Sequence, residues 1–159
     1  RDRLRSRGLG DVYKRQFVAF AKEADGFVFG APVHYAAAAG GITAFLDRAF
    51  YSASSAGAQV FRLKPAAAIV SARRAGTTAA LDQLNKYFTI SQMPIISSRY
   101  WNMVHGNTPA EVEQDLEGMQ VMRFLGRNMA YFLKCIEAGR KAGVPLPREE
   151  GRIATNFIR

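Results

Sequence analysis

With 159 residues, 48% of them hydrophobic, the chain is long enough to bury one substantial core and too short for two ordinary domains. Charged residues at 22% and aromatic residues at 11% exclude a wholly disordered chain and a fibrous protein. The net charge of +9 would suit a nucleic-acid-binding protein, but residues 1–16 hold six of the basic residues against two acidic ones. Because the excess is concentrated at one end, the composition predicts a soluble single-domain protein without a nucleic-acid partner.

Residues 1–16 read RDRLRSRGLGDVYKRQ and differ from everything that follows. They lack a starting methionine and a sustained apolar period. One interpretation is a basic arm for nucleic acid or acidic lipid; the other, which we favour, is a disordered or non-native segment that lies outside the fold.

The single cysteine, Cys135, excludes an internal disulfide and fits a reducing compartment. It lies among apolar positions at helical spacing, which predicts a buried structural thiol. No apolar run is long enough to span a bilayer, so we expect a cytoplasmic protein that does not contact a membrane. Neither histidine has a partner at metal-ligand spacing, so we expect no metal site.

From Phe17 onward, helical and strand patterns alternate along the chain. The pattern predicts a helix end at 17–24, a strand at 27–31, a helix at 41–51, a strand at 65–70, a helix through 81–88, a strand at 93–96 and a helix at 109–142. Short apolar strands such as 27–31 are typical of parallel strands buried on both faces. The order indicates an α/β fold, with a parallel sheet sandwiched by helices.

Capping residues mark the ends of two predicted helices, and an apolar stripe marks the buried side of the last one. The threonines at 77 and 78 can cap the helix that follows them. Thr108 and Glu111 form a capping box with Pro109 at the first helical position, and Gly143 ends the long helix. The apolar stripe of that helix, which includes its methionines, is expected in the core.

Ligands bind parallel sheets at the carboxyl ends of the strands, so the loops 32–40, 71–78 and 97–107 are the expected site. The first loop joins Tyr35 to a run of alanines and glycines. A flavin ring needs an aromatic wall, backbone donors and small residues that let the backbone approach. The other interpretation is an ordinary small-residue turn with Tyr35 packed on a helix.

The segments Asp25–Tyr35 and Phe45–Arg48, with Ser71–Thr78, Tyr100–Asn102 and Leu125–Met129, closely resemble the flavodoxin-like NAD(P)H-dependent FMN reductase family. The resemblance covers roughly residues 17–159. It implies a partial flavodoxin-like domain at 17–143. The proline-bearing residues 144–159 that follow are expected to form a tail that wraps a partner subunit. Family members begin with a strand and a Ser/Gly-rich phosphate-binding loop, so the first strands are expected to be missing and flavin retention to be weak.

The resemblance also implies the cofactor site. It places Pro32, Val33, His34 and Tyr35 against the flavin ring, Ser71, Ala72, Arg73 and Gly76 at the border of the pocket, and Trp101 and Asn102 after the third strand, where they close it. A cation such as Arg73 would stabilise the negative charge of reduced flavin; otherwise Arg73 and Arg74 are solvated surface charges. Trp101 suits a core or subunit-interface anchor nearly as well.

The implied function is an FMN-dependent NAD(P)H oxidoreductase. Hydride would pass from the nicotinamide to FMN and then to a small-molecule acceptor such as a quinone, free flavin or nitro or azo compound. No protein general base is required for this chemistry. The alternative is a flavodoxin-like electron carrier or flavin-binding module without turnover of its own. The resemblance also implies a homodimer.

Overall fold

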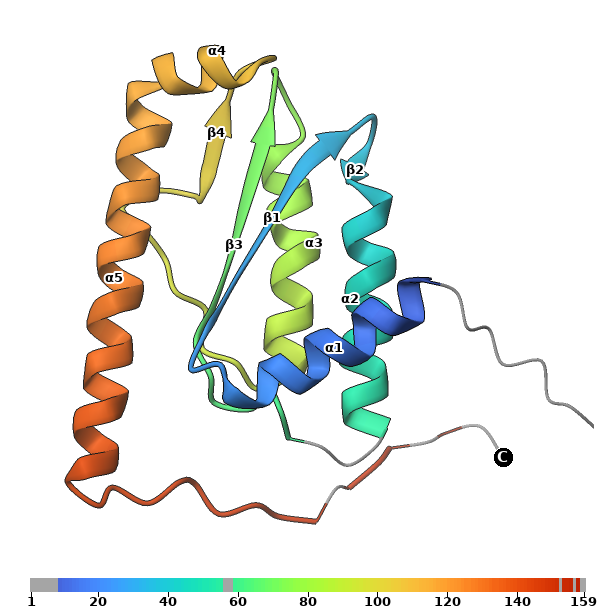
Figure 1. Ribbon diagram of the computed structural model, residues 1–159, viewed down its shortest axis with the longest axis vertical. Helices are drawn as coiled ribbons and strands as arrows, with labels where there is room; N and C mark the ends of the chain where they lie inside the picture. The colour runs from blue at the N-terminus through green and yellow to red at the C-terminus, as the bar shows by residue number, and fades with distance from the viewer. Residues whose placement is uncertain (1–8, 56–58, 152, 156, 158–159) are drawn as a thin grey trace, which may run out of the picture.

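The computed structural model describes residues 9–55, 59–151, 153–155 and 157. Residues 1–8, half of the basic segment, lie outside this range. The elements follow in this order: α1 (Leu9–Glu23), β1 (Phe27–His34), β2 (Ala37–Ala38), α2 (Gly40–Ser55), β3 (Ala66–Ala72), α3 (Thr77–Ile90), β4 (Met103–His105), α4 (Pro109–Gln114) and α5 (Leu116–Lys141). The predicted α/β alternation is confirmed (Figure 1).

The strands form one sheet in the order β2-β1-β3-β4. β1 pairs with β3 and β3 with β4 in parallel, while the short β2 is antiparallel to the end of β1. The arrowheads of β1, β3 and β4 point to the same end of the molecule in Figure 1, the upper one. The loops after β1 and β3 therefore meet at one edge, as the sequence predicted.

Helices pack on both faces of the sheet, but they cover its strands unequally. α5 contributes Leu125 and Met129, which pack with Ala67 of β3, and α1, α2 and α3 cover the opposite face. β3 is accordingly buried on both faces, as predicted.

The same prediction for β1 is wrong. Buried and exposed residues alternate along this strand, and Val28 is 53% exposed. The described helices cover only the face that carries Phe27 and Phe29, because α5 lies over β3 and β4.

Aromatic rings fill the core between the sheet and α1, α2 and α3. Phe50 stacks on Phe61 with the ring centroids 4.1 Å apart, and Phe29 of β1 stacks on Phe88 of α3 at 5.5 Å. Phe88 is fully buried. Since Phe29 belongs to β1, this packing fixes the strand that leads into the predicted flavin loop.

Two helices begin or end elsewhere than predicted. α1 begins at Leu9, inside the segment expected to lie outside the fold, and α2 continues to Ser55, beyond its predicted end at residue 51. Gly76 occupies the N-cap position of α3 but has no side chain that could accept a hydrogen bond, and Thr77 and Thr78 lie inside the helix rather than capping it.

The single long helix predicted at 109–142 is instead two helices, α4 and α5, that meet at Asp115. Its carboxylate accepts hydrogen bonds from the backbone N–H of Gly118 (2.9 Å) and of His105 (2.7 Å). Asp115 therefore caps a new helix and ties it to β4. Thr108 caps α4, and Gly143, with φ of 77°, ends the second helix, as predicted.

The prediction of a strand at residues 93–96 is wrong. Only an isolated bridge joins Ile95 to Ala66, and the regular strand is β4, which follows Trp101 and Asn102. Pro94 has no N–H, and its carbonyl accepts from Ala66 (2.9 Å). The chain then leaves β3 and returns to it at Met103, so these two predicted site residues precede the strand instead of following it.

α5 exposes several residues that the sequence predicted to be buried. Cys135 is exposed rather than buried. Leu116, Phe132 and Ile136 of the expected core stripe are also exposed, because the sheet reaches only the part of the helix near Leu125. No helix in the described part of the chain is long and apolar enough to cross a membrane.

Tyr87 of α3 gives a pH-dependent contact with α2. Its hydroxyl donates to Asp47 Oδ1 at 2.5 Å, and burial, this hydrogen bond and the nearby carboxylate raise the pKa of Tyr87 from 10.0 to about 12. Below pH 10 the Tyr87 side chain is neutral in both the folded and the unfolded chain, so its hydrogen bond to Asp47 contributes fully to the free energy of unfolding there. This contribution is lost as the pH rises to about 12, since the unfolded chain releases its proton first. Urea unfolding between these pH values should show a smaller loss of stability in Tyr87→Phe than in wild type.

Candidate functional site

The first predicted loop is a tight hairpin at the carboxyl edge of the sheet. β1 runs beyond its predicted end to His34 and turns into β2, pairing Val33 with Ala38. The backbone N–H of Ala38 donates to Gln83 Oε1 of α3 at 3.3 Å. Tyr35 occupies the tip, with φ of 46° and a fully exposed side chain. Its ring is therefore free to stack on a ligand.

The second loop joins β3 to α3 and meets the first. Pro32 and Ser71 are register partners in the parallel sheet. A Cβ built on Gly76 would lie 2.9 Å from Val33 Cγ1, so the two backbones are closely apposed. α3 begins directly after Gly76 without a side-chain cap, which leaves the N–H groups of its first turn and the positive end of its dipole facing this edge.

A cavity of about 360 Å³ lies beside this meeting point, on the α5 side of the sheet. Pro32 and Ser71 line it, together with Gly30 and other apolar groups of β1 and β3. Met119 and Met122 of α5 close its far side. The sequence predicted that these methionines belong to the core. Their apolar spacing gave no indication that a cavity separates them from the sheet.

Trp101 and Asn102 do not join this cavity. Trp101, 56% exposed, lines a separate cavity of about 70 Å³ with His105 and Asp115. Asn102 is buried and its Nδ2 donates to Ile96 O at 3.4 Å, while its Oδ1 has no hydrogen-bond partner among the described groups. Their contact with a flavin stays a prediction.

The remaining predicted residues border the carboxyl edge. His34 and Arg73 are exposed, as is Arg74. Ala72 is buried, and its carbonyl accepts from the N–H of Gly106 at 3.1 Å. The structure thus brings Pro32 and Val33 together with Ser71 and Gly76.

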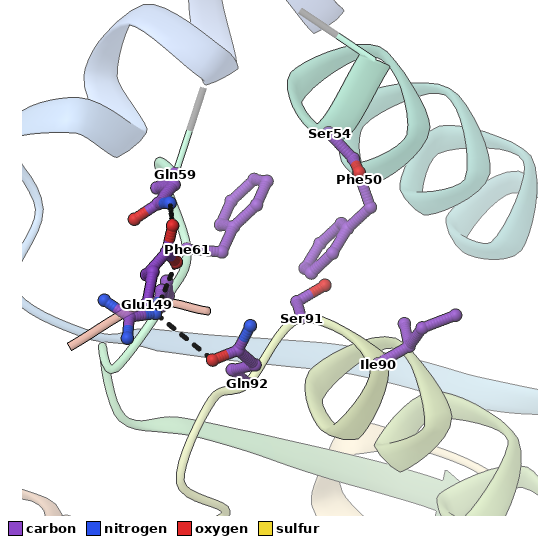
Figure 2. A pocket seen from close by; sticks show the side chains of 9 residues that line it. Phe50, Ser54, Gln59, Phe61, Ile90, Ser91, Gln92 and Glu149 are labelled. Atoms are coloured by element: carbon purple, nitrogen blue, oxygen red, sulfur yellow. Dashed lines mark hydrogen bonds and ion pairs between the residues drawn. The ribbon is translucent and has the colours of Figure 1, made fainter. Parts of the chain in front are cut away.

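A further cavity, of about 260 Å³, lies at the opposite, amino end of the strands. Phe50, Phe61 and Glu149 of the C-terminal segment are among the residues that line it (Figure 2). Glu149 pairs with Arg62 Nε at 3.1 Å, which anchors this segment across the strand starts. This cavity is remote from the loops where a parallel sheet binds ligands.

The sequence profile of the NADPH-dependent FMN reductase family matches residues 12–108, more than half of the chain. The chain belongs to this family. The match begins within α1, upstream of the predicted domain start at Phe17.

Individual relatives are more distant. The chain is 25% identical over 127 residues to an iron-sulfur flavoprotein of Methanocaldococcus jannaschii, covering 73% of this chain and 62% of that protein. It therefore spans less than two thirds of that relative's length. In the described part of this chain, no three His, Cys, Asp or Glu side chains gather as metal ligands.

Solved structures share the fold. The Trp repressor binding protein of Bacillus subtilis matches with a TM-score of 0.57 and 16% identity, over 76% of this chain and 70% of that one. An NADPH-quinone reductase of P. pentosaceus matches with a TM-score of 0.55 and 13% identity, over 78% and 76%. The flavodoxin-like fold is thereby confirmed.

Family membership implies FMN with NAD(P)H, and the residues at the carboxyl edge fit the flavin ring. The exposed ring of Tyr35 offers a stacking surface, and Gly76 permits close backbone approach. The uncapped start of α3 offers N–H donors and positive potential for an electron-rich ring edge. FMN, when bound, supplies the hydride and electron-transfer chemistry. The residues at the carboxyl edge would hold the ring, orient it and favour negative charge on it.

Proposed function

We propose that this chain holds the ring of FMN in an NAD(P)H-dependent oxidoreductase that reduces a small-molecule acceptor, such as a quinone or a free flavin. The convergence of Pro32 and Val33 with Ser71 and Gly76 beside the uncapped start of α3 carries this proposal. These groups come from two loops at one edge of a parallel sheet, the position where such sheets bind ligands. Arg73 and Arg74, exposed in the second loop, add positive charge.

Tyr35 supplies the test, because its exposed side chain can be removed without opening the core. Tyr35→Ala should weaken FMN binding about three- to tenfold, the loss expected for one aromatic stacking contact. Quenching of FMN fluorescence measures the affinity, which we expect to be low even in wild type. Tyr51→Ala removes an equally bulky exposed ring, 77% exposed on α2, and should leave the affinity unchanged. Equal effects of the two substitutions would contradict the proposed ring site.

Turnover separates the enzyme from the electron carrier. An oxidoreductase consumes NADPH steadily when FMN and a quinone are added, whereas a carrier consumes none without a separate reductase. The homodimer expected from the resemblance stays a prediction, which light scattering would test.

A further inference from the structure

A cluster of basic and aromatic side chains lies where the segment leading into β4 packs on α5. The guanidinium carbons of Arg99 and Arg127 lie 5.4 and 5.6 Å from the centroid of the same ring, that of Phe124. Neither arginine forms an ion pair with a carboxylate of the described residues. The two guanidinium groups therefore concentrate positive charge around one ring without a neutralising carboxylate, which favours binding of an anion.

The arginine from the loop is held in place before any ligand arrives. Three hydrogen bonds fasten its segment to α5: Ser98 Oγ to Val121 O (2.6 Å), Asn128 Nδ2 to Ser97 O (2.8 Å) and Arg99 Nη1 to Gln120 Oε1 (3.1 Å). A binding group that is already ordered loses little entropy on binding.

An aromatic pair directly follows the first arginine. The rings of Tyr100 and Trp101 have centroids 5.0 Å apart, and each residue is 56% exposed. Exposed aromatic faces stack planar heterocycles. The small cavity beside Trp101 is also lined by Asp115 and Glu117, whose carboxylates disfavour a phosphate there. A ligand with both a heterocycle and a phosphate would therefore direct its phosphate toward Arg99.

We propose that this surface binds the adenosine 2′-phosphate end of NADPH, with the purine on Tyr100 and Trp101 and the 2′-phosphate on the guanidinium groups around Phe124, those of Arg99 and Arg127. The planar guanidinium group donates paired hydrogen bonds that match phosphate oxygens. The inference rests on the proposed function, in which NAD(P)H is the reductant, and it assigns a preference for the phosphorylated nucleotide to these two arginines.

Trp101 is the only tryptophan of the chain, so its fluorescence reports directly on this surface. The titrants are adenosine 2′,5′-bisphosphate, its isomer adenosine 5′-diphosphate, and inorganic phosphate. We expect saturable quenching by the bisphosphate with an affinity at least about tenfold higher than that of its isomer, as expected for a charged hydrogen-bonded contact. No flavin is present, so failure here and failure of the flavin site are separate results.

The double variant Arg99→Gln/Arg127→Gln should lose at least about tenfold in affinity for the bisphosphate. Arg48→Gln/Arg140→Gln removes the same charge from exposed sites on α2 and the far end of α5, and should bind as wild type. Circular dichroism confirms that both variants fold. The proposal is overturned if the first variant binds as wild type, if both variants lose equally, if the isomers bind equally, or if phosphate alone competes as well as the bisphosphate.

Discussion

Replacing Phe88 with alanine is expected to lower the free energy of unfolding by about 3–5 kcal/mol, the usual cost of emptying a fully buried phenylalanine site. Phe88 is 0% exposed and stacks on Phe29 at 5.5 Å. A loss of this size is a large part of the stability of an ordinary domain, about 5–15 kcal/mol. Urea unfolding followed by circular dichroism measures it. Because Phe29 belongs to the strand that carries the flavin loop, FMN binding should fall as well.

Phe20→Ala is the matched control, since it deletes the same side chain from a position 75% exposed on α1. Its effect should stay within about 0.5 kcal/mol, as for most surface substitutions. Similar losses in the two variants would show that the core does not lie between the sheet and α3.

Replacing Gly76 with alanine is expected to lower the free energy of unfolding by about 1–2 kcal/mol, the cost of placing an L side chain in the left-handed region. The φ of Gly76 is 94°, and the added Cβ would stand 2.9 Å from Val33 Cγ1. Relief of this contact separates the two loops of the candidate site. FMN affinity should therefore decrease together with stability, and the fluorescence titration used for Tyr35→Ala measures it.

Replacing Gly126 with alanine should instead raise the free energy of unfolding. Gly126 lies inside α5, and nothing lies within 4 Å of a Cβ built there. Alanine should stabilise the helix by about 0.5–1 kcal/mol, because glycine is the poorer helix former. If Gly76→Ala were also stabilising, the close contact between the two loops would not exist in solution.

The sequence predicted the elements whose signal is local. Buried β3 and amphipathic α3 were recognised from apolar spacing, and Thr108 with Pro109 from capping chemistry. Features that depend on distant partners were missed. Asp115 breaks the last helix because its carboxylate accepts a hydrogen bond from the N–H of His105, which lies ten residues earlier in β4. No local motif in the sequence marks this contact. The exposed face of β1 depends on where α5 lies, which apolar spacing does not encode.

The candidate site was predicted in part for a similar reason. Loops that follow neighbouring parallel strands must meet, so Pro32 and Ser71 were placed together correctly. Trp101 and Asn102 were assigned to the same edge because the third strand was expected at 93–96. That strand is regular only from Met103, so the two residues lie on its approach, and Trp101 lines a different cavity.

Strand β1, which helices cover on one face only, also has an edge that promotes self-association. Along Phe27–Ala31 it pairs only with β3 among the described strands, so its other edge presents unpaired amide and carbonyl groups next to exposed Val28. An unpaired edge beside apolar side chains is a template for a strand of another molecule. Self-association should therefore rise with protein concentration, and a charged substitution such as Val28→Lys should suppress it.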